Sequence, residues 1–391
     1  MGSTKTQMVL LAYLGYVLLG ISAAVIGPLW ANSLQATFNE SVDALGWVLL
    51  TASLGYIVGS ANSARFFTHF STAIVFALST LIAGVGFIGY AISPTWMMVV
   101  GFGFVTGFGT GVLDGGTNIY FAAYFNERLM NWLHAAFGIG SLIAPQLINL
   151  LVVDRPENWR LLYAILAGMF LLVSAAFMLT RHWWQPLQTS EEKRKTSDAS
   201  TFRLPIVWIG ILLFIFYTGA EGTAGSWGVS LFDSRGVSLA IANNWISAYW
   251  LSFTVGRIFF GVIITRLNTD TTIRLCLVAA TGAALLLWAN PSELLSGLGI
   301  VVYGFALSPI FALMITLTQA RLGPVHAPNA IAASVAAAGI GAGILPAIVG
   351  VAVGLTNFEI VPIILVGLAA GMLVLYQVSM AQGFKLKVES A

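Results

Sequence analysis

Charge is scarce in this sequence of 391 residues. Asp, Glu, Lys and Arg together make up 8% of it, whereas hydrophobic residues make up 58%. A soluble domain carries roughly 25% charged residues, so the composition indicates an integral membrane protein. The formal net charge of +2 is small, and we expect no nucleic-acid partner.

Cysteine is nearly absent as well. Cys276 is the one cysteine in the chain, which excludes an intramolecular disulfide and a cysteine-based metal site. We interpret it as a small core residue within an apolar run. The sequence also shows no nucleophile–base constellation, metal cluster or phosphate loop. We therefore expect a protein that is not an enzyme and that has no metal or organic cofactor.

Apolar runs near the roughly 20 residues needed to cross a bilayer recur along the whole chain. They predict an all-α membrane protein with twelve transmembrane helices. The gaps between them are mostly short and leave no room for a soluble domain. The predicted spans are 8–30, 43–64, 70–92, 95–123, 130–152, 159–180, 204–231, 240–264, 272–290, 294–319, 328–354 and 358–381.

Basic residues predict the orientation, because cytoplasmic segments carry an excess of Lys and Arg. With the N-terminus inside, fourteen of the 17 Lys and Arg residues fall on the cytoplasmic side, and Arg155, Arg160 and Arg235 remain outside. We therefore expect both termini in the cytoplasm and a multi-pass protein of the plasma (inner) membrane, with the lipid bilayer as its surroundings. We expect a monomer.

Two of the fifteen acidic residues, Asp114 and Glu221, lie inside membrane-length apolar runs. A carboxylate in hydrocarbon is costly, so it usually faces a cavity and marks an ion or substrate path. One of these acids lies in each half of the chain, which indicates a transporter with both as proton-coupling candidates. The alternative for each is a fixed role: a permanent interhelical hydrogen bond for Asp114, and a protonated, packed side chain for Glu221.

The two halves of the chain repeat each other. Gly138–Pro145 in the fifth span is echoed by Gly339–Pro346 in the eleventh, an offset of 201 (339 − 138). Arg65 after the second span and Arg266 after the eighth have the same offset (266 − 65). Matches at one offset favour two six-helix pseudo-repeats related by an axis along the membrane normal.

We therefore predict an N-terminal six-helix half at 1–180 and a C-terminal six-helix half at 204–391. The stretch 181–203 between them reads as a cytoplasmic linker, since it gathers five consecutive charged residues at 191–195.

A chain of this kind resembles the major facilitator superfamily, and the resemblance covers essentially its whole length. The pattern Gly256-Arg257…Gly261…Arg266 is similar to that family's cytoplasmic loop motif, and the copy that ends at Arg65 is degenerate. The resemblance implies the major facilitator fold. It also implies conformational or gating roles for Arg65, Arg257 and Arg266.

Within the superfamily, Gly107–Asn118 followed by Leu133–Gly138 resembles the fucose/glucose–cation symporter branch. That branch places an acidic residue and a nearby Asn in the fourth span, as Asp114 and Asn118 stand here. Gly219 to Glu221 followed by Trp227 is similar to its glucose-transporting members. Fucose-type members also carry an Asp in the first span, and this sequence has no carboxylate there.

Asp114 and Asn118 lie one helical turn apart, so they share a face of the fourth span. An amide both donates and accepts hydrogen bonds, which suits Asn118, Gln146 and Asn149 to recognition of sugar hydroxyls. For Gln146 and Asn149 the alternative is interhelical hydrogen bonding. Trp227 and Trp250 are the tryptophans that we expect at the solute. Trp227 and Glu221 can line one cavity only if the glycine-rich stretch around Glu221 is unwound.

His134 lies near the cytoplasmic end of the fifth span. It is a third proton-coupling candidate, as a proton exit or an inner-gate hydrogen bond, and the alternative is a bond to a loop carbonyl. The driving ion that we expect is H⁺, with Na⁺ as the other possibility.

The sequence thus predicts a secondary active transporter that works by alternating access. We expect proton-coupled uptake of a neutral hexose-like sugar. The alternative is a proton-coupled exporter of amphipathic compounds or of another small solute. A non-transporting receptor or assembly subunit is disfavoured, because the chain has no large loops and repeats internally.

Overall fold

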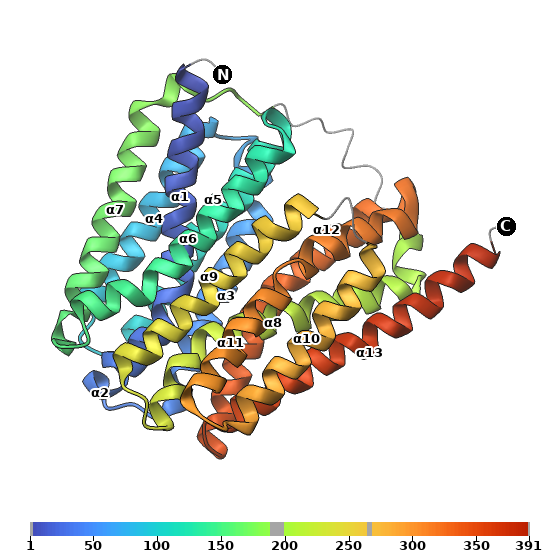
Figure 1. The fold of residues 1–391 in the computed structure, drawn as a ribbon. Coiled ribbons are helices and arrows are strands. Elements are labelled where there is room, and N and C mark those ends of the chain that lie inside the picture. The colour runs from blue at the N-terminus through green and yellow to red at the C-terminus, as the bar shows by residue number, and fades with distance from the viewer. Residues whose placement is uncertain (1–2, 188–198, 264–267, 390–391) are drawn as a thin grey trace.

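The structure, a computed structural model, describes residues 3–187, 199–263 and 268–389, and these residues are helical almost throughout. Twelve of the described helices are long and apolar enough to cross a membrane, which confirms the predicted all-α fold with twelve spans. Figure 1 shows them as one bundle. The first six spans are α1 (Ser3–Leu29), α3 (Leu45–Phe66), α4 (Thr72–Ile92), α5 (Trp96–Tyr124), α6 (Glu127–Leu151) and α7 (Trp159–Leu179).

The remaining spans come from six further helices that are packed mainly on each other. Two of them share the tenth and eleventh spans, because α12 runs on past a break at Gly323, whose φ of 64° suits glycine. The six helices are α8 (Pro205–Ser234), α9 (Leu239–Ile263), α10 (Thr269–Ala289), α11 (Glu293–Leu307), α12 (Ile310–Leu355) and α13 (Ile360–Glu389).

The first span is longer than predicted. After α1 the chain continues through a π-helical turn, η1 (Trp30–Leu34), into the short helix α2 (Gln35–Phe38). Pro28 has no N–H to donate, and the Asn32 side-chain amide donates to its carbonyl at 2.7 Å. A π-turn inside a membrane helix often marks a functional site.

Two sets of helices, α1–α7 and α8–α13, meet along three pairs of elements: α6 with α9, α3 with α12, and α1 with α8. The repeated glycine motif takes equivalent places in the two sets. Gly138 of α6 faces Thr254 of α9, and Gly343 of α12 faces Ser53 of α3. Both copies of the motif therefore line the boundary between the sets.

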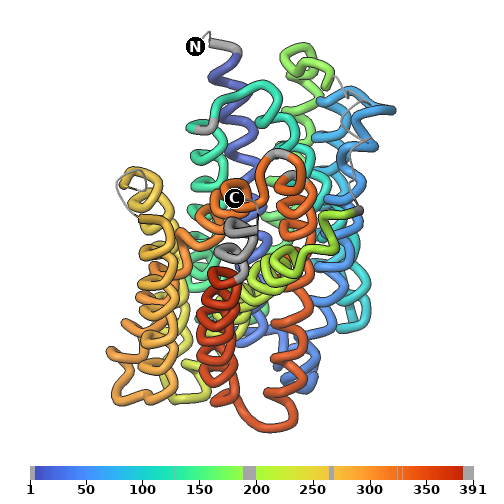
Figure 2. The backbone as a smooth tube through the Cα atoms, turned by 90° about the vertical axis from the view of Figure 1, so that its right-hand side faces the viewer, coloured from blue at the N-terminus to red at the C-terminus, as the bar shows by residue number. Residues whose placement is uncertain are grey.

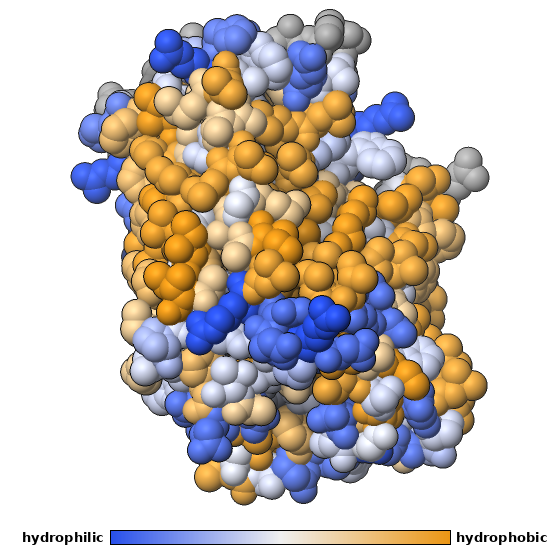
Figure 3. Space-filling view, turned by 90° about the vertical axis from the view of Figure 1, so that its left-hand side faces the viewer, coloured by the Kyte–Doolittle hydropathy of each residue, from blue (hydrophilic) through white to orange (hydrophobic). Residues whose placement is uncertain are grey.

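The two ends of the bundle differ. We call the end with the N-terminus and the α3–α4 connection the terminus end, and the end with the α6–α7 and α8–α9 connections the far end. In Figures 1 and 2 the two sets lie close together at the far end and spread apart toward the terminus end. Figure 3 shows a broad hydrophobic face with hydrophilic residues gathered above and below it, as a membrane-spanning bundle requires.

The predicted division at 181–203 stays a prediction. Much of that stretch, including all five charged residues at 191–195, lies outside the described residues. Its described end, η6 (Ala199–Arg203), leads directly into α8, where Pro205 occupies the first turn as a helix start favours.

Candidate functional site

Asp114 lies about two-thirds of the way along α5 and is held by three hydrogen-bond donors. The Tyr16 hydroxyl donates to its Oδ1 at 2.7 Å, and the Asn118 amide donates to the same oxygen at 3.1 Å. The Tyr56 hydroxyl donates to Oδ2. Asn118 also donates to the Tyr16 hydroxyl at 2.9 Å. We call these four residues the Asp114 cage.

Three helices contribute residues to the cage: α1 contributes Tyr16, α3 contributes Tyr56, and α5 contributes Asp114 and Asn118. A Cβ atom at Gly111 would overlap the backbone of Tyr56, so this glycine lets α3 approach α5 closely enough for the hydroxyl to reach the carboxylate. Asp114 itself is half-buried. Donors from three helices thus converge on one partly exposed carboxylate.

A second polar group, the Glu221–Arg257 cluster, lies in the other set of helices. Arg257 of α9 interacts electrostatically with Glu221 and Tyr217 of α8, and its guanidinium lies 4.3 Å from the centre of the Phe253 ring. The Tyr249 hydroxyl donates to the Glu221 carbonyl at 3.2 Å. Although its pattern resembles a cytoplasmic loop motif, Arg257 falls within the predicted span 240–264, and the structure places it there too, six residues before the last residue of α9.

His134 lies between the two groups. Its ring meets the Tyr16 ring edge-on at 5.8 Å, and it interacts electrostatically with both Asp114 and Arg257. The structure therefore brings together the three predicted coupling residues, Asp114, His134 and Glu221, through Arg257. This chain of polar groups crosses the boundary between the two sets of helices.

Gln146 and Asn149 do not join this chain. They lie at the far end, where the Gln146 amide donates to Asn244 Oδ1 at 3.0 Å and to Ser247 Oγ at 2.9 Å. Asn149 donates to Asn244 Oδ1 at 3.0 Å and accepts from Asn243 at 2.9 Å. In this conformation these amides make the interhelical bonds that were the alternative to sugar contacts.

Asn32 of η1 extends the same group, which we call the far-end amides: Asn32, Gln146 and Asn149 from one set, and Asn243 and Asn244 from the other. Asn32 and Asn243 exchange hydrogen bonds at 3.3 Å in both directions. Within the described ranges, the side-chain hydrogen bonds between the two sets all join η1 or α6 to α9. The far end is therefore closed by uncharged groups.

Trp227 has no face free for a solute. Its side chain is fully buried, and its indole N–H donates to the Pro346 carbonyl at 2.9 Å. The glycine-rich stretch is also not unwound, because α8 is one continuous helix from Pro205 to Ser234. The condition under which Trp227 and Glu221 would line one cavity is thus not met here, and Trp227 fastens α8 to α12 instead.

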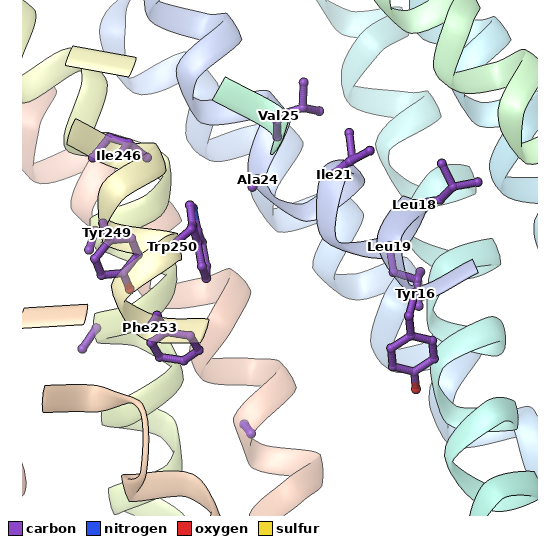
Figure 4. Packing of buried hydrophobic residues seen from close by; sticks show 14 of the residues in the cluster. Tyr16, Leu18, Leu19, Ile21, Ala24, Val25, Ile246, Tyr249, Trp250 and Phe253 are labelled. Carbon is purple, nitrogen blue, oxygen red and sulfur yellow. The ribbon is translucent and has the colours of Figure 1, made fainter. Parts of the chain in front are cut away.

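Trp250 lies closer to the centre of the bundle. In Figure 4 it lies on the side of α9 that faces α1, the helix that carries Tyr16. The side chain is 5% exposed, and its indole N–H has no hydrogen-bond partner among the described residues. A role at the solute stays a prediction for Trp250.

The other predicted gating residues lie at the terminus end. Arg65 is exposed near the C-terminus of α3, where its carbonyl accepts a bond from the Thr68 hydroxyl at 2.7 Å. Arg266 lies outside the described residues. Their gating roles stay predictions.

Tyr16, Tyr56 and the α9 amides are the residues that the sequence did not single out. One signal was present: a carboxylate inside a membrane needs donors, and a buried tyrosine hydroxyl needs a partner. Tyrosines in spans otherwise poor in polar groups were therefore candidates. Their separation in sequence, 98 residues for Tyr16 and 58 for Tyr56, hid the pairing.

Known proteins similar to this chain include two that are named as sugar transporters. The "Sodium-dependent glucose transporter 1" of Homo sapiens is 24% identical over 89% of this chain and 73% of its own length. The "Glucose/mannose transporter GlcP" of Bacillus subtilis is 23% identical over 79% of each chain. A yeast relative, "Bypass of stop codon protein 6" of Saccharomyces cerevisiae, is 24% identical, and the match spans only 56% of its length.

Solved structures show the same fold. The crystal structure of the nucleoside transporter NupG superimposes with a TM-score of 0.76 at 17% identity, covering 97% of this chain and 99% of that one. The sequence profile of the Major Facilitator Superfamily matches residues 12–346. With twelve membrane helices in this arrangement, the chain is a multi-pass membrane transporter that belongs to the Major Facilitator Superfamily.

Proposed function

We propose that this transporter carries a neutral hexose-like sugar together with a proton by alternating access. Asp114 is the principal proton site and Glu221 a second coupling site. The observation that carries the proposal is the Asp114 cage: a half-buried carboxylate in the middle of a span, held by donors from three helices and linked through His134 to the other set. Buried carboxylates of this kind mark proton paths in transporters.

The cage couples proton binding to structure. Both carboxylate oxygens accept hydrogen bonds, so a proton that binds there forces at least one donor to turn away or to leave. Coupling requires that the proton affinity differ between the two end states. A cage that is assembled in only one of these states provides that difference. With the orientation that the basic residues predict, the far end, where the amides join the two sets, is the outer face.

The polar groups near the cage favour a neutral, hydroxyl-rich solute. Asn118 carries both a donor and an acceptor, and Arg257 already interacts with Glu221 rather than standing alone. The names of the human and Bacillus relatives, a glucose and a glucose/mannose transporter, favour the same class of solute. The name of the human relative also favours Na⁺ as a second candidate for the driving ion.

The test is sugar-evoked ion movement in vesicles. Purified protein is reconstituted in proteoliposomes that contain a pH-sensitive dye, and a panel of neutral sugars is added with and without Na⁺. Acidification with one group of stereoisomers supports proton symport, whereas uptake that needs Na⁺ without acidification moves the assignment to Na⁺. If no sugar evokes a response with or without Na⁺, and the vesicles extrude a lipophilic cation, the protein is instead a proton-coupled exporter of amphipathic compounds.

A further inference from the structure

Tyr56 is a donor of the Asp114 cage that also lies beside the other set of helices. A Cβ atom at Gly339 of α12 would lie 3.9 Å from Tyr56 Cε1 and 3.3 Å from Ile57 Cγ1. The hydrogen-bond and ring partners described for Tyr16 and Asn118, by contrast, all belong to α1–α7. Tyr56 therefore touches both the proton site and the boundary.

This boundary is a seam of small residues that ends at Tyr56. From the far end inward, Gly46 lies against Ala347 and Ser53 against Gly343, and Ile57 with Tyr56 lies against Gly339. Beyond this point the sets spread apart toward the terminus end (Figure 1). A movement of the Tyr56 side chain thus affects the packing of α3 against α12 at the inner end of this seam.

The hydrogen bonds of the cage indicate where a proton enters. Oδ1 of Asp114 accepts from both Tyr16 and Asn118, whereas Oδ2 accepts from Tyr56 alone. The Tyr16 hydroxyl is further held by the bond that it accepts from Asn118 at 2.9 Å. For the Tyr56 hydroxyl, Asp114 is the one hydrogen-bond partner within the described part of the chain. A proton on Oδ2 therefore acts first on the bond to Tyr56.

The remaining titratable and charged groups near the carboxylate do not offer the same link. From α1 it faces Tyr16, from α3 Tyr56, and from α6 His134, which interacts with it electrostatically and in turn with Arg257 of α9. His134 acts at a distance through its charge, and no hydrogen bond joins it to Asp114 among the described residues. A direct mechanical connection to the boundary runs through Tyr56.

We propose that Tyr56 is the positioning residue that transmits the protonation state of Asp114 to the α3–α12 seam. With an ionised carboxylate, the hydroxyl donates to Oδ2 and the ring stays beside Gly339. When a proton occupies Oδ2, the carboxyl O–H donates to the Tyr56 oxygen instead, so a charge-assisted bond is replaced by a weaker neutral one. The ring is then held less firmly beside Gly339, and the seam is released for the other end state. This inference rests on the proposed function, since it needs Asp114 to bind the transported proton.

The test compares Tyr56→Phe with Tyr16→Phe as its matched control. Each variant removes one hydroxyl donor from the same carboxylate and keeps the aromatic ring. A hydrogen bond to a charged group contributes enough that its loss makes proton binding about tenfold tighter in both variants. What differs is the boundary: Tyr56 lies beside Gly339 of α12, whereas the described hydrogen-bond and ring partners of Tyr16 all belong to α1–α7.

The conformation is read separately from proton binding. In a Cys276→Ser background, spin labels on Asp154→Cys and Ser238→Cys, which lie exposed on the two sets at the far end, report the distance between the sets in reconstituted full-length protein. The wild type and Tyr16→Phe are expected to shift their distance distributions between neutral and acidic pH. Tyr56→Phe is expected to bind the proton and yet keep one distribution at every pH.

Two results overturn the inference while leaving proton coupling in place: a pH-dependent shift of normal size in Tyr56→Phe, or loss of the shift in both tyrosine variants alike. Absence of any pH response in the wild type overturns the inference and the proposed proton coupling together. Gly339→Ala is a second probe, which leaves the cage chemically intact and crowds the ring from α12. It is expected to move the pH midpoint of the conformational shift without changing which sugars are carried.

Discussion

Asn243→Ala is expected to open the far end of the bundle. Asn243 is fully buried, donates to Asn149 at 2.9 Å and exchanges two hydrogen bonds of 3.3 Å with Asn32. At a net ~0.5–1.5 kcal/mol each, the three bonds that are lost sum to about 2–4 kcal/mol. All of them exist only while the two sets are closed here, so the closed state alone is weakened.

A loss of this size changes the ratio of closed to open protein by about 30- to 1000-fold, since each 1.4 kcal/mol is a factor of ten. The spin-label pair at Asp154 and Ser238 measures it directly as growth of a longer distance population. Asn62→Ala is the matched control, because the Asn62 amide donates only to Val58 of its own helix, at 2.8 Å.

An unchanged distance distribution in Asn243→Ala would refute the reasoning, because it would mean that the amides do not hold the sets together. Uncharged bonds also predict that the closed state is insensitive to ionic strength. A strong salt dependence of the same distances would point to charged groups as the closing contact instead.

Two further changes separate packing from recognition. Gly343→Ala is expected to destabilise the protein by about 1–3 kcal/mol, because a methyl group would overlap the Ser53 side chain. Adding Ser53→Gly in the same chain is expected to restore the melting temperature. A double variant that stays destabilised would contradict the close contact of Gly343 with Ser53. Trp227→Phe is expected to lower the melting temperature through loss of the bond to Pro346 while the KM for sugar is retained. A large rise in KM at unchanged stability would return Trp227 to the solute site.

The fold was accessible from the sequence because its signals are local. Apolar length predicts each span, and the 201-residue offset between Gly138 and Gly339 predicts that equivalent residues meet at equivalent boundaries, as they do in α6 and α12. The extension of the first span through η1 was missed, since a π-turn has no composition of its own. The break in α12 at Gly323 lies between the predicted spans 294–319 and 328–354, so here the hydropathy pattern and the structure agree.

The site was only partly accessible. Asp114 and Glu221 stand out because a carboxylate in an apolar run is rare, and Asn118 follows from helical spacing. The partners of these residues could not be predicted, because contacts between spans depend on the rotation and tilt of the helices. In a chain that is hydrophobic almost throughout, the periodicity of the sequence does not reveal either. Arg257 shows the same limit: the predicted span 240–264 contains it, but its interaction with Glu221 depends on how α8 and α9 pack.

The role of Asp114 is tested most directly by separating exchange from accumulation. Asp114→Asn keeps the shape of the side chain and removes the proton site, so proteoliposomes that contain it are expected to exchange labelled for unlabelled sugar near the wild-type rate. The same vesicles are expected neither to accumulate sugar in response to an imposed pH gradient nor to acidify when sugar is added. Accumulation at the wild-type level in Asp114→Asn would contradict the assignment of Asp114 as the coupling residue.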